Sequence, residues 1–274
     1  MRTTRLILPV LAVLIGIGLL WRFFFADASR DELFLYCGAG LRPAVEEIVG
    51  MFIEETGMPV RVDYNASSLL LGRMKVSRSG DLFIPGDEYY IDRAAAEGLI
   101  EASWPVAEFV PVIMVAKGNP RNIRGFEDLL REGVRMGLAD ARTAAVGRTA
   151  RLIFAKNNIS KQQIERNLVF ESVTVPELAT NVELGHLDAA IVWRPVAARA
   201  SQAEYVEIPP ELNVTAPVPV AILSFSERQE QARQFVEFIR SEKSMAVFQR
   251  HLYDPPGSNV NFEQGVTSHG LSVK

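Results

Sequence analysis

Short apolar runs alternate with stretches of helical periodicity along most of this sequence. Leu33 to Cys37 is one such run, and after it apolar residues recur at helical spacing as far as Phe52, with Gly57 as a helix C-cap. The same succession repeats down the chain to about Leu252. This alternation is typical of βα units on parallel-rich sheets. The sequence therefore predicts an α/β protein with mixed sheets and flanking helices.

The predicted strands and helices fall into two sets. The apolar stretch that begins at Phe109 and the strand near Val218 are the places where the chain passes from one set to the other. A chain that crosses twice forms a hinge, and the cleft between two such lobes favours a ligand site. We expect one lobe to contain residues 29–108 and 218–274, and the other to contain residues 109–217.

Residues 1–28 form a separate N-terminal segment. Two arginines precede an uncharged run from Leu6 to Trp21, and a segment of this kind directs export. Ala26-Asp27-Ala28 offers a cleavage site for a signal peptide. Residues 6–26 are also long enough to span ~30 Å of hydrocarbon as a retained transmembrane anchor. Both alternatives place the rest of the chain in the periplasm or another extracytoplasmic space, in the second case tethered to the cytoplasmic membrane.

Composition excludes several classes of function. The formal net charge of −4 argues against a nucleic-acid surface, which is normally basic. Cys37 is the only cysteine, so no intramolecular disulfide can form, and we expect this residue to be buried in a strand. The three histidines show no metal-ligand spacing with it or with each other.

Four junctions between a strand and a helix share one chemical character. They carry small or hydroxylated residues and contain no Asp, Glu, Lys or His. The junctions are residues 37–41, 65–68, 143–147 and 172–176. A helix N-terminus exposes free N–H groups and the positive end of its dipole, so several such ends aimed at one point would hold an anion without any lysine. Ordinary capping explains any single junction, but the four together favour an anion site.

The sequence contains none of the common catalytic motifs. It has no nucleophile elbow with a partnering His-Asp pair, no phosphate-binding loop, no dinucleotide glycine pattern and no HExxH. We therefore expect a binding protein, not an enzyme, and no cofactor apart from the bound ligand.

From Leu33 to Leu252 the sequence resembles the periplasmic molybdate-binding proteins of ABC transporters. The order and spacing of the matching stretches are more specific than any one of them. These stretches are residues 35–52 with 55–57, 64–68, 80–84, 117–120, 145–148 and 182–193. The resemblance implies the two-lobed type II periplasmic binding protein fold, with the ligand cleft between the lobes.

The resemblance also implies which residues contact the ligand. In that family two serine-bearing turns, two backbone amides and a tyrosine hydroxyl hold the oxyanion, all of them neutral donors. Ser67 matches the second serine turn, with Ser68 beside it. Val146 and Val175 fall on the two amide-donating positions. These residues would contact the oxygen atoms of a metal-containing oxyanion and would not bind a bare metal ion.

Three positions depart from the family pattern or extend it. Gly40 stands where the first serine is usual, so one hydroxyl donor is missing, although its backbone N–H remains. Trp193 stands at the tyrosine position and can donate one hydrogen bond from its indole N–H. Arg194 follows it, and its guanidinium either reaches the anion or is solvated at the rim of the cleft.

The predicted function is capture of molybdate or tungstate for the permease of an ABC importer. The first alternative is a membrane-tethered sensor or orphan binder of another small anion, such as sulfate or phosphate. An enzyme on the same scaffold is disfavoured by the missing catalytic groups. The export segment and the lack of DNA-binding helices count against the effector domain of a cytoplasmic regulator.

Overall fold

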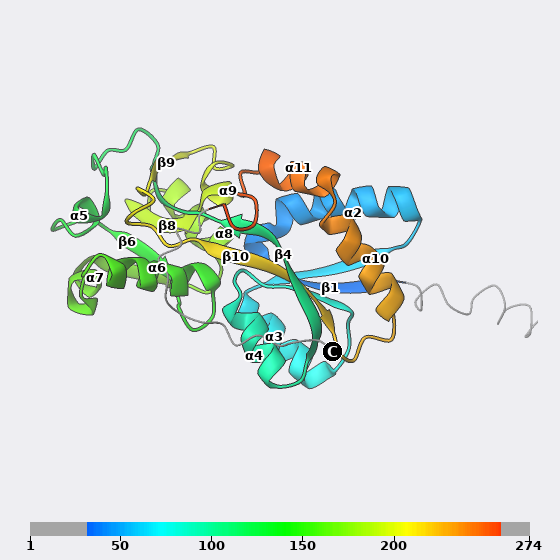
Figure 1. Ribbon diagram of the computed structural model, residues 1–274. Coiled ribbons are helices and arrows are strands. Elements are labelled where there is room, and N and C mark those ends of the chain that lie inside the picture. The colour runs from blue at the N-terminus through cyan, green and yellow to red at the C-terminus, as the bar shows by residue number, and fades with distance from the viewer. Residues whose placement is uncertain (1–31, 259–274) are drawn as a thin grey trace, which may run out of the picture.

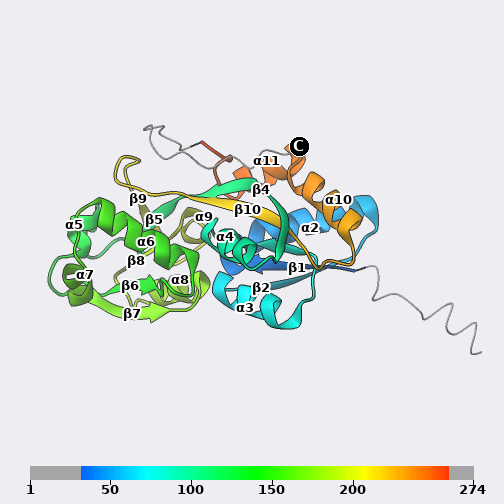
Figure 2. The same ribbon diagram turned by 60° about the horizontal axis from the view of Figure 1, so that its bottom comes forward.

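The computed structural model describes residues 32–258, which form two five-stranded sheets lying side by side (Figures 1 and 2). Helices flank each sheet. This arrangement confirms the predicted two-lobed α/β fold with mixed sheets.

The first sheet has the strand order β2-β1-β3-β10-β4. Its strands are β1 (Leu33–Gly38), β2 (Val60–Asn65), β3 (Leu82–Ile84), β4 (Ile100–Phe109) and β10 (Ala216–Leu223). Strands β1, β2 and β3 are parallel, whereas β10 runs antiparallel to both β3 and β4. The carboxyl ends of the three parallel strands consequently lie at one edge of this sheet.

Helices cover both faces of the first sheet (Figure 1). The 3-10 helix η1 (Ala39–Leu41) leads into α2 (Arg42–Thr56), which packs with α10 (Gln229–Ile239) and α11 (Glu242–Arg250) on one face. Helices α3 (Ser67–Ser77) and α4 (Tyr89–Ala96) lie together on the other.

The second sheet has the strand order β7-β6-β8-β5-β9. Its strands are β5 (Pro111–Ala116), β6 (Met136–Ala139), β7 (Leu168–Ser172), β8 (Ala189–Trp193) and β9 (Ala203–Glu207). Its helices are α5 (Phe126–Leu129), α6 (Ala145–Lys156), α7 (Lys161–Asn167), α8 (Val175–Glu183) and α9 (Arg194–Ala197). Strands β6, β7 and β8 are parallel, so their carboxyl ends also share one edge.

The chain crosses between the sheets twice. Val110 joins β4 to β5, and residues 208–215 join β9 back to β10. The two crossovers are tied together, because the Asn213 side chain donates a hydrogen bond of 3.0 Å to the Pro111 carbonyl. After α11 the chain returns to this region, where Asp254 exchanges backbone hydrogen bonds of 2.8 and 3.1 Å with Glu108 of β4.

The apolar core follows this division only in part. One cluster of buried side chains fills the first lobe and continues onto the α8 face of the second sheet, through Phe109 and Trp193. A second cluster lies under α6 and contains Ile153 and Phe154. The aromatic pair therefore belongs to a core that both lobes share.

Some local features differ from the sequence-based expectation. Strand β4 was not expected, because its first half has no fully buried residue and contains Pro105. It is the edge strand of the first sheet, the position where a strand tolerates proline. Serine is a preferred N-cap residue, but the N-cap of α3 is Ala66, and Ser67 is the first helical residue.

The predicted signal peptide or anchor at residues 1–28 lies outside the described residues. Within residues 32–258, no helix combines the length and the apolar character needed to cross a membrane.

One of the ion pairs that join the two lobes contains an almost completely buried carboxylate. Arg148 of α6 donates from Nε and Nη2, at 2.9 and 2.7 Å, to one carboxylate oxygen of Asp87, which follows β3. The Asp87 side chain is 1% exposed. Burial raises the pKa of this carboxyl, and the Arg148 guanidinium offsets part of that rise. The carboxylate of one lobe therefore depends on the cation of the other.

We predict that Arg148→Met lowers the free energy of unfolding by about 1–3 kcal/mol, because it leaves the buried Asp87 carboxylate without its partner. Adding Asp87→Asn to that variant should restore part of the loss. The control is Arg151→Met, one turn further along α6, because Arg151 pairs with the half-exposed Glu171 within its own lobe. Urea denaturation measures all four proteins. Equal losses for Arg148→Met and Arg151→Met would show that the interlobe pair contributes no more than a surface contact.

Candidate functional site

A small cavity lies where the carboxyl ends of the parallel strands of the two sheets face each other. Its volume is about 20 Å³, close to the space that one water molecule needs. The residues that line it are Gly38, Ala39, Gly40, Asn65, Ala66, Ser67, Gly86, Phe109, Ala144, Ala145, Val173, Thr174, Val175 and Trp193. The lobes therefore close tightly on this point, and a ligand larger than water requires them to move slightly apart.

Three turns of the first lobe form one side of this cavity. The turn after β1 contributes Gly40, and the start of α3 after β2 contributes Ser67. The loop after β3 contributes Gly86, whose N–H donates a hydrogen bond of 3.0 Å to the Ser67 hydroxyl. Because the Ser67 oxygen already accepts this bond, its own O–H remains available as a donor toward a ligand.

The second lobe closes the other side with two helix N-termini and one aromatic ring. Helix α6 begins at Ala145, and α8 begins at Val175 with Pro176 in its first turn. Trp193 ends β8 and presents its indole to the cavity. The groups that line the cavity therefore follow or end β6, β7 and β8 at the same edge of the second sheet.

The two lobes touch around this cavity. A Cβ atom built on Gly86 would lie 2.8 Å from the Cβ of Ala145, so any side chain at position 86 would push the lobes apart. The Ser68 backbone N–H donates across the gap to the Thr143 carbonyl at 3.3 Å. These contacts place the start of α3 directly opposite the start of α6.

An aromatic wall forms one end of the cavity. Phe109 and Trp193 stack with ring centroids 4.3 Å apart and an interplanar angle of 10°. The Tyr253 ring packs on Phe109, and its hydroxyl donates a hydrogen bond of 2.8 Å to the Gly40 carbonyl. Burial raises the pKa of this hydroxyl, so it remains protonated and acts as a donor.

The electrostatics of the cavity come from the backbone. No residue that lines it among the described part of the chain has an ionisable side chain. The helices α3, α6 and α8 each begin there, and the first N–H groups of a helix have no partner within it and carry partial positive charge. This arrangement suits an anion that accepts several hydrogen bonds.

The structure brings some of the predicted site residues together and not others. Gly40, Ser67, Val175 and Trp193 all line this cavity. The Val146 side chain is fully buried beneath it, and as the second residue of α6 it can offer only its backbone N–H. Ser68 does not line the cavity, and its buried hydroxyl has no hydrogen-bond partner within residues 32–258.

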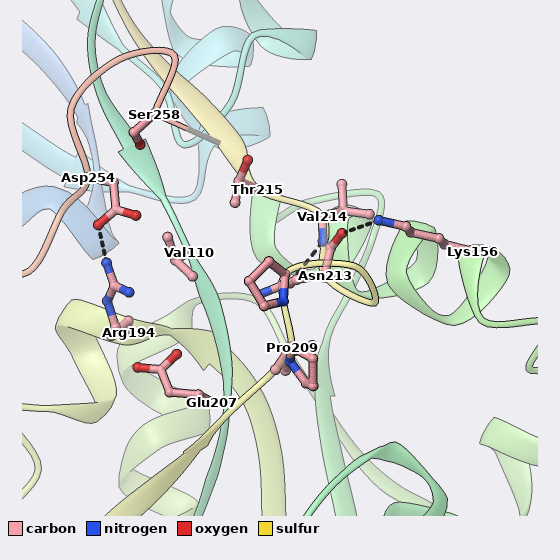
Figure 3. Close-up of a pocket in the computed structure, with 12 residues that line it drawn as sticks. Val110, Lys156, Arg194, Glu207, Pro209, Asn213, Val214, Thr215, Asp254 and Ser258 are labelled. Atoms are coloured by element: carbon pink, nitrogen blue, oxygen red, sulfur yellow. Dashed lines mark hydrogen bonds and ion pairs between the residues drawn. The ribbon is translucent and has the colours of Figure 1, made fainter. Parts of the chain in front are cut away.

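Arg194 lies away from this cavity. Its guanidinium forms an ion pair with Asp254 and lines a second cavity of about 740 Å³ beside the crossovers (Figure 3). Lys156 lies in the same cavity and donates to the Asn213 carbonyl at 2.8 Å. Of the two sequence-based alternatives for Arg194, ligand contact or a solvated rim, the structure shows neither directly, and its guanidinium instead pairs with Asp254 in the segment after α11.

Three groups around the site were not identified from the sequence. Gly86 and Phe109 line the cavity, and Tyr253 fixes the Gly40 turn. Gly86 follows the short strand β3 within Pro85-Gly86-Asp87, which is a turn signal with no indication of its partner. Nothing in the local sequence connects Tyr253 to Gly40, because 213 positions separate them.

The structure offers no sign of metal or nucleophilic chemistry in its described part. No group of three His, Cys, Asp or Glu side chains within residues 32–258 could hold a metal ion. Cys37 is buried, as expected, and burial raises the pKa of its thiol well above the usual value. A neutral, inaccessible thiol is a poor nucleophile.

Comparison with known proteins identifies relatives over nearly all of the described chain. The family model for bacterial extracellular solute-binding proteins matches residues 33–254. A putative binding protein of Haemophilus influenzae is 29% identical over 222 residues, which cover 81% of this chain and 90% of that protein. The molybdate-binding protein ModA of Mycobacterium bovis is 26% identical over 229 residues, covering 82% and 85% of the two chains.

Solved structures show the same fold. The sulfate-binding protein SubI from Mycobacterium tuberculosis superposes with a TM-score of 0.72 at 20% identity, covering 84% of this chain and 88% of that one. At this level of identity the similarity concerns the fold and leaves the ligand open.

Proposed function

This chain belongs to the family of bacterial extracellular solute-binding proteins, and we propose that it captures a tetrahedral oxyanion, molybdate or tungstate, for the permease of an ABC importer. The observation that carries this proposal is the convergence of the α3, α6 and α8 N-termini on one cavity without ionisable side chains. Oriented N–H groups can balance the charge of an anion there without a lysine or arginine.

We assign the ligand contacts to donors of both lobes. The Ser67 hydroxyl and the Gly40 backbone N–H would act from the first lobe, and the first N–H groups of α6 and α8, including those of Val146 and Val175, from the second. The Trp193 indole N–H adds a group that can only donate. Closure of the lobes excludes water, and each neutral donor then contributes more than it would on an open surface.

This donor set disfavours phosphate. Near neutral pH phosphate retains a proton, and its P–OH group needs an acceptor in a dry site. Molybdate and tungstate are fully deprotonated dianions under these conditions and only accept hydrogen bonds. No carboxylate lines the cavity among the described residues, so the strongest acceptor for a P–OH proton is missing there.

Sulfate is the serious competitor, because it is also a dianion and a sulfate-binding protein shares the fold. Molybdate is favoured by the relatives named molybdate-binding proteins and by the sequence resemblance at the four junctions. The larger anion also needs more space, so the extent of lobe closure separates the two ligands.

A membrane-tethered sensor or orphan binder of another small anion is the alternative use of this site. It would keep residues 1–28 as an anchor and present the closed lobes to another membrane protein instead of a permease. The family consists of solute-binding proteins, which supports a binding role over an enzymatic one in either case.

The first prediction concerns the ligand itself. Molybdate or tungstate at 100 times its dissociation constant should stabilise the purified protein by ~2.7 kcal/mol, which raises the melting temperature by roughly 5–10 °C. Sulfate and phosphate at equal concentration should give much smaller shifts, and sodium chloride at matched ionic strength is the control. A sulfate shift as large as that of molybdate would contradict the molybdate assignment, and no shift with any oxyanion would contradict the anion site.

A second prediction concerns Ser67. Ser67→Ala removes a donor from a dry site and should weaken molybdate binding by about 1–3 kcal/mol, or roughly five- to 150-fold. The matched control is Ser77→Ala at the other end of α3, because its hydroxyl also has a hydrogen-bonding neighbour, the Tyr36 hydroxyl at 3.3 Å, but lies away from the cavity. Calorimetric titration measures both. Equal affinities of the two variants would remove Ser67 from the site.

A further inference from the structure

Gly40 is a glycine whose backbone conformation does not require one. Its φ lies outside the left-handed region that favours glycine. A Cβ atom built on it would lie 3.0 Å from Cδ1 and 3.5 Å from Nε1 of Trp193, and 3.5 Å from Cζ of Phe109. The neighbouring rings therefore leave little room for a side chain at position 40. The closest of them is the edge of the Trp193 indole that carries Nε1.

The Trp193 ring has little freedom to retreat from position 40. It is 2% exposed, and its face is stacked on Phe109 at 4.3 Å between centroids. Behind Phe109 lies the Tyr253 ring at 5.1 Å. In a core packed this closely, an added methyl group strains the neighbouring side chains and backbone, because there is no empty space to take it up.

The ring contacts from Trp193 through Phe109 to Tyr253 lead back to the Gly40 turn. The Tyr253 hydroxyl donates to the Gly40 carbonyl at 2.8 Å, so the turn is held from its carbonyl side, while the indole edge lies against the position that a Cβ atom would take. Four separate segments supply these groups, namely η1, the end of β4, the end of β8 and the chain after α11. A side chain at position 40 could be accommodated only if the ring, the turn or the lobe closure changed.

We propose that Gly40 and Trp193 act as one specificity-determining unit. The absence of a side chain at position 40 allows the indole edge to enter the cavity from the second lobe, and this edge sets the space for the ligand and directs one N–H toward it. The inference rests on the proposed function. It adds that the two positions, one in each lobe, together determine which size of ligand the cavity accepts. A methyl group at position 40 reduces that space, so it discriminates against larger oxyanions more than against smaller ones.

The melting temperature of the ligand-free protein tests the packing. Gly50→Ala in α2 is the matched control, because nothing lies within 4 Å of its added Cβ, and this change should raise the melting temperature. Gly40→Ala should lower it. In a Trp193→Leu background, which lacks the indole edge, Gly40→Ala should no longer lower it. A rise for Gly40→Ala in the wild-type background, or the same loss in both backgrounds, would overturn the coupling.

Calorimetric titrations with molybdate and with sulfate test the effect of the two positions on ligand binding. Gly40→Ala should weaken molybdate binding at least fivefold and sulfate binding less, so the ratio of the molybdate to the sulfate dissociation constant rises. Trp193→Phe keeps an aromatic ring against Phe109 but deletes the N–H, and it should weaken both anions at least fivefold. An unchanged ratio in Gly40→Ala, or unchanged affinities in Trp193→Phe, would overturn the specificity role.

Failure of the proposed function gives a different result from failure of this inference. If the wild-type protein binds neither molybdate nor sulfate, the oxyanion assignment fails, and the melting temperatures alone then decide whether Gly40 and Trp193 are coupled. The wild-type protein could instead bind molybdate while Gly40→Ala changes neither the ratio of the dissociation constants nor the melting temperature. That result would support the proposed function and contradict the coupling of Gly40 and Trp193.

Discussion

The first N–H groups of a helix have no partner inside that helix, and in this protein three long helices begin around the same cavity. The parallel strands bring this about, because every βα unit places the start of its helix at the carboxyl edge of the sheet. Two sheets whose carboxyl edges face each other therefore direct helix N-termini toward a common point. An anion at that point satisfies donors from both lobes at once, and no charged side chain is needed to hold it.

The same constraint explains why the contacts between the lobes surround the cavity. Gly86 and Ala145 meet on one side, and Gly40 and Trp193 meet on another. Further out, Asp87 of the first lobe is a buried carboxylate whose cation, Arg148, comes from the second. Each of these contacts depends on the distance between the lobes. Opening of the cleft would break them together, so under the proposed function the distance between the lobes and the binding of the ligand would be energetically linked.

The segment after α11 joins the hinge to the site. Asp254 pairs with the backbone of Glu108 in β4 and with the Arg194 guanidinium next to Trp193, and Tyr253 beside it holds the Gly40 turn. The geometry of the cavity thus relies on residues that are distant in sequence and lie outside the cavity itself. The pair with Asp254 holds the Arg194 guanidinium away from the small cavity, although Trp193, the residue before it, lines that cavity.

Much of the fold could be predicted because its signals are local. Periodicity and a glycine cap located β1 and α2 closely, and the small residues at the strand ends pointed to the junctions that meet at the cavity. What could not be predicted depends on distant partners. The sequence around Ser67 does not show that its hydroxyl accepts a hydrogen bond from the N–H of Gly86, which follows another strand. The pairing of Arg194 with Asp254 spans 60 positions, and β4 is recognisable only from its place at the sheet edge.

The most direct test is a crystal structure of the protein grown with tungstate, with diffraction data collected at a tungsten absorption edge. The account predicts one strong anomalous peak between the N-termini of α3, α6 and α8, within hydrogen-bonding distance of the Ser67 hydroxyl and the Trp193 indole nitrogen. A peak in the larger cavity beside Lys156 and Arg194, or no peak between the lobes, would contradict it.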